Sequence, residues 1–238
     1  MCIRDSYTSW NEQTHMSKEN IEPYSSTVFV GIDFGLTPAA TFGQRLVTGQ
    51  WLILQELVCF DMGVTRFAEL LKHEIAKNYK GLDLEIYGDP AGDFRSQTDE
   101  TTPFQILRHM GIRAVPAPSN DVLIRLESVN AVLSRMVDGE SGILLDPKCN
   151  NLIRGFSGGY HYRRLQVSGE RYDEKPNKNR FSHIHDALQY LLLGAGEGRA
   201  LTIGKKTNKP IVVYVEWIAS INPNIISAKP HKLFIINK

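Results

Sequence analysis

The segment VFVGIDF, residues 28–34, constrains the fold more than any other part of this 238-residue sequence. It is almost continuously apolar and rich in β-forming residues, as a strand buried on both faces should be. Two further strand patterns follow at about 39–47 and at WLILQELV, residues 51–58, with a turn between them at 48–50. The sequence therefore predicts a meander of three strands that begins with a buried strand.

Helix and strand patterns alternate after the meander. In chain order they are a helix at 67–79, a strand at 84–90, a helix at 103–110, a strand at 112–115, a helix at about 121–138, and a last helix from the expected N-cap Ser182 to Gly194. This order is that of the ribonuclease H-like fold, an α/β fold with a mixed five-stranded sheet flanked by helices. In that fold the first and fourth strands lie side by side.

Three aspartates occupy related places in this order. Asp33 lies near the end of the first strand, Asp89 at the end of the fourth, and Asp186 in the first turn of the last helix. Because neighbouring parallel strands end at one edge of the sheet, we expect Asp33 and Asp89 to converge there, where the last helix can add Asp186. Each aspartate alone has an ordinary explanation as a turn former or a first-turn residue favoured by the helix dipole. Only their joint placement indicates a site.

Three converging carboxylates repel one another unless cations neutralise them, and oxygen ligands favour Mg²⁺ or Mn²⁺. Two such ions can clamp the attacking and leaving oxygens of a phosphodiester. We therefore expect Asp33, Asp89 and Asp186 to be both the catalytic and the metal-binding residues of a two-metal-ion nuclease that hydrolyses phosphodiesters.

Four further side chains are weaker candidates for this site. His183 and His185 lie at the start of the helix that carries Asp186 and could orient a phosphate or the attacking water, although capping or surface roles explain them equally well. Asp93 and Asp121 are candidate accessory acids, and most acids in such positions are turn or surface residues.

A basic stretch, residues 148–180, precedes the last helix and is expected to form a hairpin-like insert. It carries eight Lys or Arg residues against three acidic ones, with aromatic residues interleaved. A DNA duplex would be held there through its phosphates with little reading of bases, whereas the alternative is a solvated hairpin. The candidate DNA-binding residues are Arg163, Arg164, Lys175, Lys178 and Arg180, with Arg125 and Arg135 as weaker candidates.

Five segments together resemble the nuclease domain of the large terminase subunit of tailed bacteriophages, over about residues 27–196. They are GIDFGLTPAATFGQ, IYGDPAGDFRSQ, APSNDVLIRLESV, GFSGGYHYRR and KNRFSHIHDALQYLL. The resemblance implies a ribonuclease H-like nuclease that cleaves concatemeric double-stranded viral DNA during genome packaging, in the cytoplasm of the infected host. By it, Asp33, Asp89 and Asp186 match the family's metal-binding acidic triad. It also implies a portal protein, a small terminase subunit and an N-terminal ATPase domain as partners.

The remaining segments are expected to lie outside this domain. Residues 1–26 are expected to form a polar linker or leader, and the first six, MCIRDS, resemble a translated sequencing adaptor. Residues 197–238 are expected to form a basic tail of unknown role. The sequence has no GxxxxGK[ST] phosphate loop, since GRALTIGKKT has the wrong spacing, so we expect a fragment without the ATPase.

Two other functional classes remain open. Residues 33–37 fit the DxGxT loop of actin and sugar kinases, but such proteins need two copies of the fold and a second phosphate loop. A non-catalytic DNA-binding packaging module would keep the fold without the chemistry. No apolar run approaches the roughly 20 residues that span a bilayer, so we expect no membrane partner. The three cysteines lack the spacing of a zinc site.

Overall fold

The buried first strand, β2 (Thr27–Asp33), lies inside a six-stranded sheet of order β6-β5-β2-β3-β4-β9. The structure, a computed structural model, describes residues 4–93, 101–165 and 171–198. All of these belong to one compact unit, Met1–Lys205, and a second unit, Lys206–Lys238, lies outside the described residues. The expected basic tail falls outside them from residue 199 onward.

The sheet is mixed, as expected for a ribonuclease H-like fold. Strand β2 pairs antiparallel with β3 and parallel with β5, so the first and fourth predicted strands are neighbours. The five predicted strands are β2, β3 (Ala39–Arg45), β4 (Trp51–Val58), β5 (Asp83–Gly88) and β6 (Ala114–Pro116). A sixth strand, β9 (Ile143–Leu145), adds to β4 in parallel and was not expected from the sequence.

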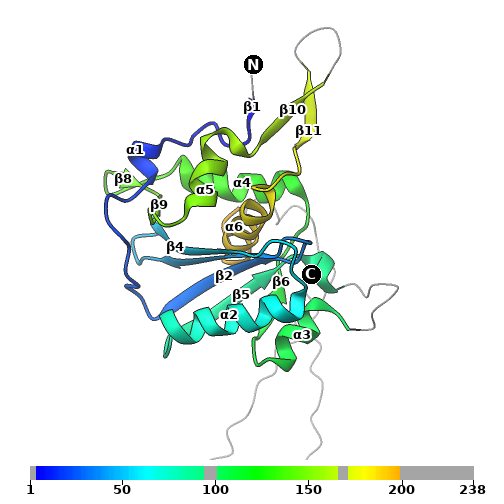
Figure 1. Ribbon diagram of the computed structural model, residues 1–238. Helices are drawn as coiled ribbons and strands as arrows, with labels where there is room; N and C mark the ends of the chain where they lie inside the picture. Colours follow the sequence, from blue (N-terminus) through cyan, green and yellow to red (C-terminus); the bar gives the residue numbers. More distant parts are fainter. Residues whose placement is uncertain (1–3, 94–100, 166–170, 199–238) are drawn as a thin grey trace, which may run out of the picture. The chain divides into compact units, whose positions relative to one another are not determined.

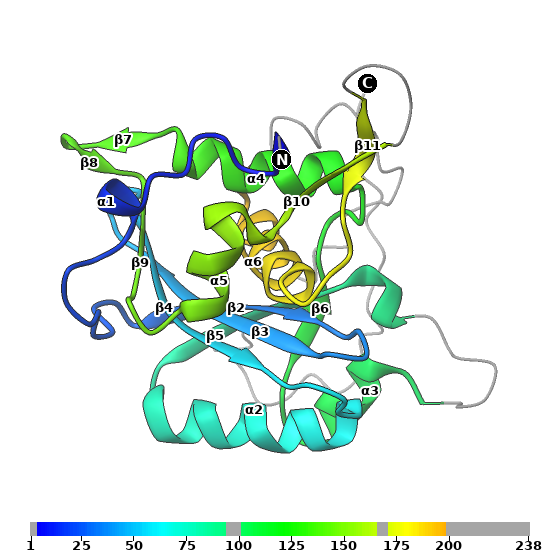
Figure 2. The same cartoon turned by 45° about the horizontal axis from the view of Figure 1, so that its top comes forward.

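Helices cover both faces of the sheet (Figure 1). One face carries α2 (Val64–Asn78) and α3 (Pro103–His109), and the other carries α4 (Val122–Leu133), α5 (Asn150–Arg154) and α6 (Ser182–Gly194). In Figure 2, α6 lies between the sheet and α4. The sheet therefore separates two apolar cores, one packed on α2 and α3 and the other packed around α6.

Glycine lets α6 lie directly on the central strand. A Cβ at Gly31 of β2 would stand 1.9 Å from the carbonyl oxygen of Ala187 in α6. The side chains of Val30 and Ile32, on either side of Gly31, pack in the core of the opposite face. Residue Asp33 follows the alternation of the strand and faces the α6 side.

Two helix boundaries differ from the expected ones. Helix α4 ends at Leu133 and not near 138, because Asp138 and Gly139, with φ of 52° and 86°, form the turn of a small hairpin. Its strands are β7 (Met136–Val137) and β8 (Glu140–Ser141). Ser182 is the first residue of α6 and not its N-cap, and its hydroxyl donates to the carbonyl of Asn179.

Residues expected to form a linker are instead packed on the domain. They include β1 (Arg4–Asp5), which pairs with β10, and a short helix, α1 (Glu12–His15). Tyr7 is buried, and the buried ring of His15 bonds the carbonyl of Leu133 at 3.0 Å. This packing was missed because isolated aromatic residues in a polar segment show no periodic pattern.

The basic stretch forms a hairpin, as expected. Its strands, β10 (His161–Arg164) and β11 (Tyr172–Pro176), pair antiparallel, and a short helical segment, η2 (Gly155–Gly159), comes directly before them. Another short helical segment, η1 (Pro90–Asp93), lies earlier in the chain, after β5. The hairpin extends away from the sheet in Figures 1 and 2. No helix in the described part of the chain is long and apolar enough to cross a membrane.

Candidate metal centre

The structure brings Asp33 and Asp89 to neighbouring strand ends. Ile32 of β2 is in register with Gly88 of β5, so the next residue on each strand is one of these aspartates. The backbone N–H of Asp89 donates to the carbonyl of Ile32 at 3.0 Å, which continues the pairing to the end of the strand. Asp33 is buried and Asp89 is half-buried, and one oxygen of Asp89 accepts from the N–H of Ala91 at 2.8 Å.

Helix α6 carries Asp186 to the same edge of the sheet. Its side chain is buried, and its Oδ1 accepts from Nη1 of the buried Arg125 at 3.0 Å. Its Oδ2 accepts from Nζ of Lys178, an exposed residue between β11 and α6. Asp186 lies in the second turn of α6 and not in the first, so the helix dipole does not account for it.

Electrostatic effects connect the three carboxylates. Burial raises the pKa of the Asp33 carboxyl, a hydrogen bond from His183 lowers it, and the nearby charge of Asp186 raises it again. Burial also raises the pKa of the Tyr190 hydroxyl, the charge of Arg125 lowers it, and the charges of Asp89, Asp186 and Asp33 each raise it. All three aspartates therefore act on one hydroxyl, which donates to Oδ1 of Asn120 at 2.8 Å.

The carboxylates share an edge but do not meet at one point. Within the described ranges, no three His, Cys, Asp or Glu side chains lie close enough together to hold a metal ion as they stand. Each aspartate is turned toward a partner of its own: Asp33 toward His183, Asp89 toward Ala91, and Asp186 toward two cations. The donor set consists of carboxylate oxygens, which suits Mg²⁺ or Mn²⁺ and does not suit softer metals.

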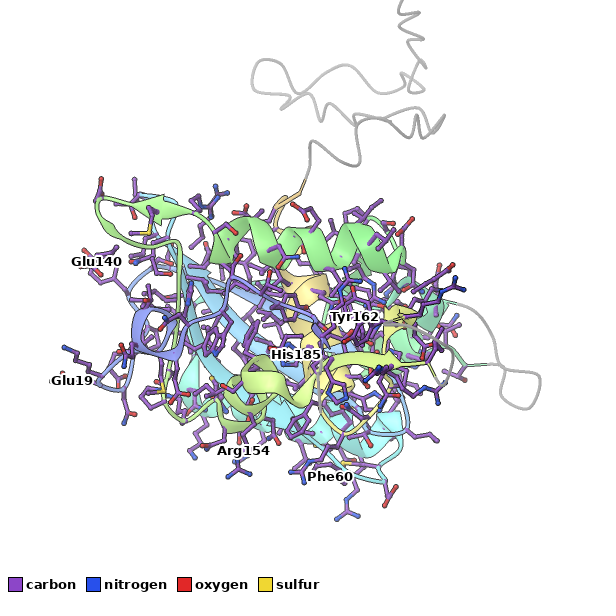
Figure 3. All side chains as sticks on the ribbon, turned by 90° about the horizontal axis from the view of Figure 1, so that it is seen from above. Glu19, Phe60, Glu140, Arg154, Tyr162 and His185 are labelled. Carbon is purple, nitrogen blue, oxygen red and sulfur yellow. The ribbon has the colours of Figure 1, made fainter. Side chains whose placement is uncertain are left out.

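The two histidines have different environments. Nδ1 of the half-buried His183 lies 2.8 Å from Oδ2 of Asp33, and a Cβ at Gly35 would stand 2.9 Å from this ring, so glycine gives it room. His185 is fully buried, and Figure 3 shows it in the interior of the domain. Burial lowers its pKa to about 3, and the rings of Phe156 and Tyr160 lie 4.6 and 5.0 Å away. His185 therefore packs in the core, unlike His183, so neither the surface role nor the phosphate-orienting role considered for it matches its burial.

The candidate accessory acids lie in a turn and a cap. Asp93 is exposed at the end of η1, four residues after Asp89. Asp121 is the N-cap of α4, and its Oδ1 accepts from the N–H of Leu123 at 3.0 Å. Asp121 therefore has the ordinary role of a capping residue.

The candidate DNA-binding residues are exposed, as phosphate contacts require. Arg163 in β10 pairs with Asp173 across the hairpin at 3.1 Å, and the guanidinium of Arg180 lies 5.0 Å from the ring of Phe181. Arg164 and Lys175 are exposed on the two strands. Lys178 differs from these four because its ammonium contacts Asp186, so it belongs to the candidate metal centre as well.

The two weaker DNA-binding candidates are paired with acidic side chains, Arg125 in the interior and Arg135 with a side chain that is 31% exposed. Arg125 is 4% exposed and bonds Asp186, while Arg135 bonds Glu197 at 3.2 Å. Arg125, a weaker candidate for DNA contact, is thus buried as a partner of Asp186. A signal was present in the sequence, because Arg125 falls on the apolar stripe of its helix, between Val122 and Val129.

Comparisons with known proteins extend the description of the fold. No protein-family model and no curated protein matches this chain. Solved structures do match. The large terminase of a thermophilic bacteriophage is 23% identical with a TM-score of 0.59, over 79% of this chain and 44% of that one. This chain thus spans less than half of that large terminase.

Two isolated domains match over most of their own length. The nuclease domain of the P22 large terminase is 14% identical with a TM-score of 0.57, over 81% of this chain and 93% of that one. The nuclease domain of the bacteriophage SPP1 large terminase, with bound Mn, is 17% identical with a TM-score of 0.50, over 73% of this chain and 92% of that one. The described part of this chain therefore has the ribonuclease H-like fold of large terminase nuclease domains.

Proposed function

We propose that this chain is the nuclease domain of a viral large terminase and that it cuts concatemeric double-stranded DNA during genome packaging. The observation that carries the proposal is the placement of Asp33, Asp89 and Asp186, on two adjacent strand ends and the helix that crosses them. The fold shared with terminase nuclease domains supports it independently, since neither the register nor the helix position depends on which acids are present.

Asp33, Asp89 and Asp186 would hold two Mg²⁺ or Mn²⁺ ions. Such ions, when bound, activate a water molecule and stabilise the leaving oxygen of a phosphodiester. Burial, and to a smaller extent the nearby charge of Asp186, raise the pKa of the Asp33 carboxyl, so a bound cation would relieve an unfavourable interaction at this carboxylate. The N–H of His183 holds one oxygen of Asp33 and so orients the carboxylate, as outer partners of metal ligands do.

Two of the aspartates have partners compatible with metal binding. Lys178, with a side chain 68% exposed, can leave Asp186 without creating a buried unpaired charge, because Arg125 remains at the other oxygen. Asp89 keeps one oxygen on the N–H of Ala91, which fixes the carboxylate at the strand end.

Double-stranded DNA would lie along the exposed cations of the hairpin and of the segment that leads into α6. Contacts to phosphates suit this surface, because they need charge and not base-reading geometry. The residues concerned are Arg163, Arg164, Lys175 and Arg180, with Lys178 between them and the carboxylates.

The wider setting is also part of the proposal. An N-terminal ATPase domain, a portal protein and a small terminase subunit would be the partners of the full-length protein, in the cytoplasm of an infected cell. The large terminase of the thermophilic bacteriophage supports this, because the matched part is 44% of its length and leaves room for another domain.

One observation favours a second candidate function, a DNA-binding packaging module without catalysis. Asp186 is already paired with two cations, Arg125 and Lys178, and the three aspartates do not form a ready metal cage among the described residues. Such a module would bind DNA but would neither bind Mn²⁺ nor cut. Calorimetric titration of the protein with Mn²⁺ distinguishes the two functions.

Cleavage of supercoiled plasmid tests the proposal. The 238-residue chain should nick and linearise plasmid in millimolar Mn²⁺ or Mg²⁺, and EDTA should stop the reaction. Asp89→Asn should lower the rate by orders of magnitude, because a metal ligand is lost. The matched control is Asp83→Asn, an exposed aspartate at the opposite end of the same strand, which should cut like wild type. A folded protein that leaves plasmid intact in Mn²⁺ would rule out the nuclease.

A further inference from the structure

A series of buried polar side chains connects Asp186 to the N-terminal segment. Nη1 of Arg125 donates to Oδ1 of Asp186 at 3.0 Å and to Oε1 of Gln189 at 2.9 Å. Nε2 of Gln189 then donates to the hydroxyl of Tyr7 at 2.8 Å. All four side chains are between 0 and 4% exposed. The series therefore runs from the candidate metal centre to a residue that precedes the whole sheet.

The chemistry of these groups fixes the direction of each bond. A guanidinium can only donate, so the carbonyl oxygen of Gln189 must face Arg125. Its amide nitrogen must then face Tyr7, whose hydroxyl accepts. Arg125 has few other restraints: Nε has no hydrogen-bond partner among the described residues, and the ring of Tyr190 lies 4.7 Å from the guanidinium carbon. Gln189 is thus a principal determinant of where the guanidinium lies.

Tyr7, the last residue of the series, is held in place by aromatic packing. Its ring packs against those of Phe156 and His185, with centroids 5.0 and 5.5 Å apart. Trp10, three residues further along the chain, stacks on Phe156 at 4.5 Å with an angle of 12° between the rings. The hydroxyl of Tyr7 is therefore held by aromatic packing and does not depend on Gln189 for its position.

We propose that Tyr7 and Gln189 are positioning residues for the candidate metal centre and that they act through Arg125. Arg125 engages Oδ1 of Asp186, which leaves Oδ2 as the oxygen that a divalent cation can share. If the guanidinium moves, the carboxylate of Asp186 can rotate, and neither of its oxygens is then held in position for a divalent cation. This inference rests on the proposed function, because it assumes that Asp186 binds a divalent ion.

The test is calorimetric titration of the 238-residue chain with Mn²⁺ alone. Tyr7→Phe keeps the ring and removes only the hydroxyl. It should weaken Mn²⁺ binding by roughly tenfold, the lower end of the range for outer partners of metal ligands. The matched control is Tyr79→Phe: Tyr79 is also buried, its hydroxyl donates to Oε1 of Gln55 at 3.1 Å, and it packs in the core on the other face of the sheet.

A merely structural role predicts a different result. Both variants remove one hydrogen bond made by a buried tyrosine, so both should melt at a somewhat lower temperature than wild type. Only Tyr7→Phe should also lose Mn²⁺ affinity. If Tyr7→Phe binds Mn²⁺ as tightly as Tyr79→Phe does, the positioning role is refuted and the proposed nuclease is unaffected. If wild type itself binds no Mn²⁺, the proposed function fails instead.

If Tyr7→Phe does not fold, a second variant allows the same measurement. Gln189→Leu has similar bulk and removes both bonds of the amide, so it should weaken Mn²⁺ binding at least as much. The variant that combines both changes should bind like Gln189→Leu alone, because the two residues act in series on one guanidinium. Fully additive losses would contradict the series and overturn the inference.

Discussion

Removing the guanidinium of Arg125 should destabilise the domain strongly. At the observed 3.0 Å, and with an effective dielectric constant of about 20, its attraction to Asp186 amounts to about 5.5 kcal/mol. The desolvation of the two ions offsets part of this attraction, but Arg125→Met leaves a carboxylate that is 2% exposed with only Lys178 as partner. Breaking a buried pair in this way costs about 3–5 kcal/mol. Lys178 remains, so we expect a loss near the lower end, about 3 kcal/mol.

Urea unfolding monitored by circular dichroism measures this loss. Arg163→Met is the matched control, because Arg163 also pairs with an aspartate but its side chain is 68% exposed, and it should cost at most about 1 kcal/mol. The double variant Arg125→Met, Asp186→Asn should recover part of the stability, since no uncompensated charge remains. A loss below about 1 kcal/mol for Arg125→Met, equal to that of Arg163→Met, would refute the stabilising role of the buried ion pair.

Three other expectations follow from the geometry. Gly31→Ala should lower the free energy of unfolding by about 3 kcal/mol or more, because α6 must move off β2, and an unchanged melting temperature would contradict this. Asp33→Asn and Asp89→Asn should each abolish most cleavage, and the double variant should cut no more slowly than the less active single variant. Additive losses of cleavage rate in kinetic assays would argue against a shared site. Replacing the exposed hairpin cations by Ala should flatten the log–log dependence of DNA affinity on salt by roughly one unit for each phosphate that is no longer bound. The change should be equal on two unrelated duplexes. Identical slopes for the variant and wild type would exclude this surface. The residues for this last test are Arg163, Arg164, Lys175 and Arg180.

Local patterns determined how much of the fold could be predicted. The apolar run of β2, and the strand and helix patterns that follow it, indicated the order of elements and hence the neighbouring positions of Asp33 and Asp89. The end of α4 was missed because Val137 continued its apolar period, although Asp138 and Gly139 form a typical hairpin turn. Strand β9 is only three residues long, so it carries almost no pattern of its own.

Helical geometry could have separated the two histidines. Residues two apart on a helix point about 200° away from each other, whereas residues three apart lie on one face. His183 and Asp186 therefore share a face, and His185 must point elsewhere, as it does in the structure. The helix itself was expected from the sequence, so the separation of the histidines was within reach.

The series of contacts behind Asp186 could not be predicted in the same way. The bond between Gln189 and Tyr7 joins residues 182 positions apart, and no periodic pattern in either segment indicates it. The position of Arg125 on an apolar stripe did indicate a buried charge, but it could not identify the partner. Long-range polar contacts of this kind depend on the packed fold, and they became visible only with it.

A crystal structure of this chain soaked in Mn²⁺, with the ions located by their anomalous scattering, would decide whether the three aspartates form a metal site. We expect Mn²⁺ bound by the carboxylates of Asp33, Asp89 and Asp186, whose oxygen ligands suit this ion. Lys178 should have left Asp186, while Arg125 should still hold its Oδ1. Well-ordered crystals with no anomalous peak at these three residues, and Lys178 still paired with Asp186, would contradict the proposed metal-dependent nuclease.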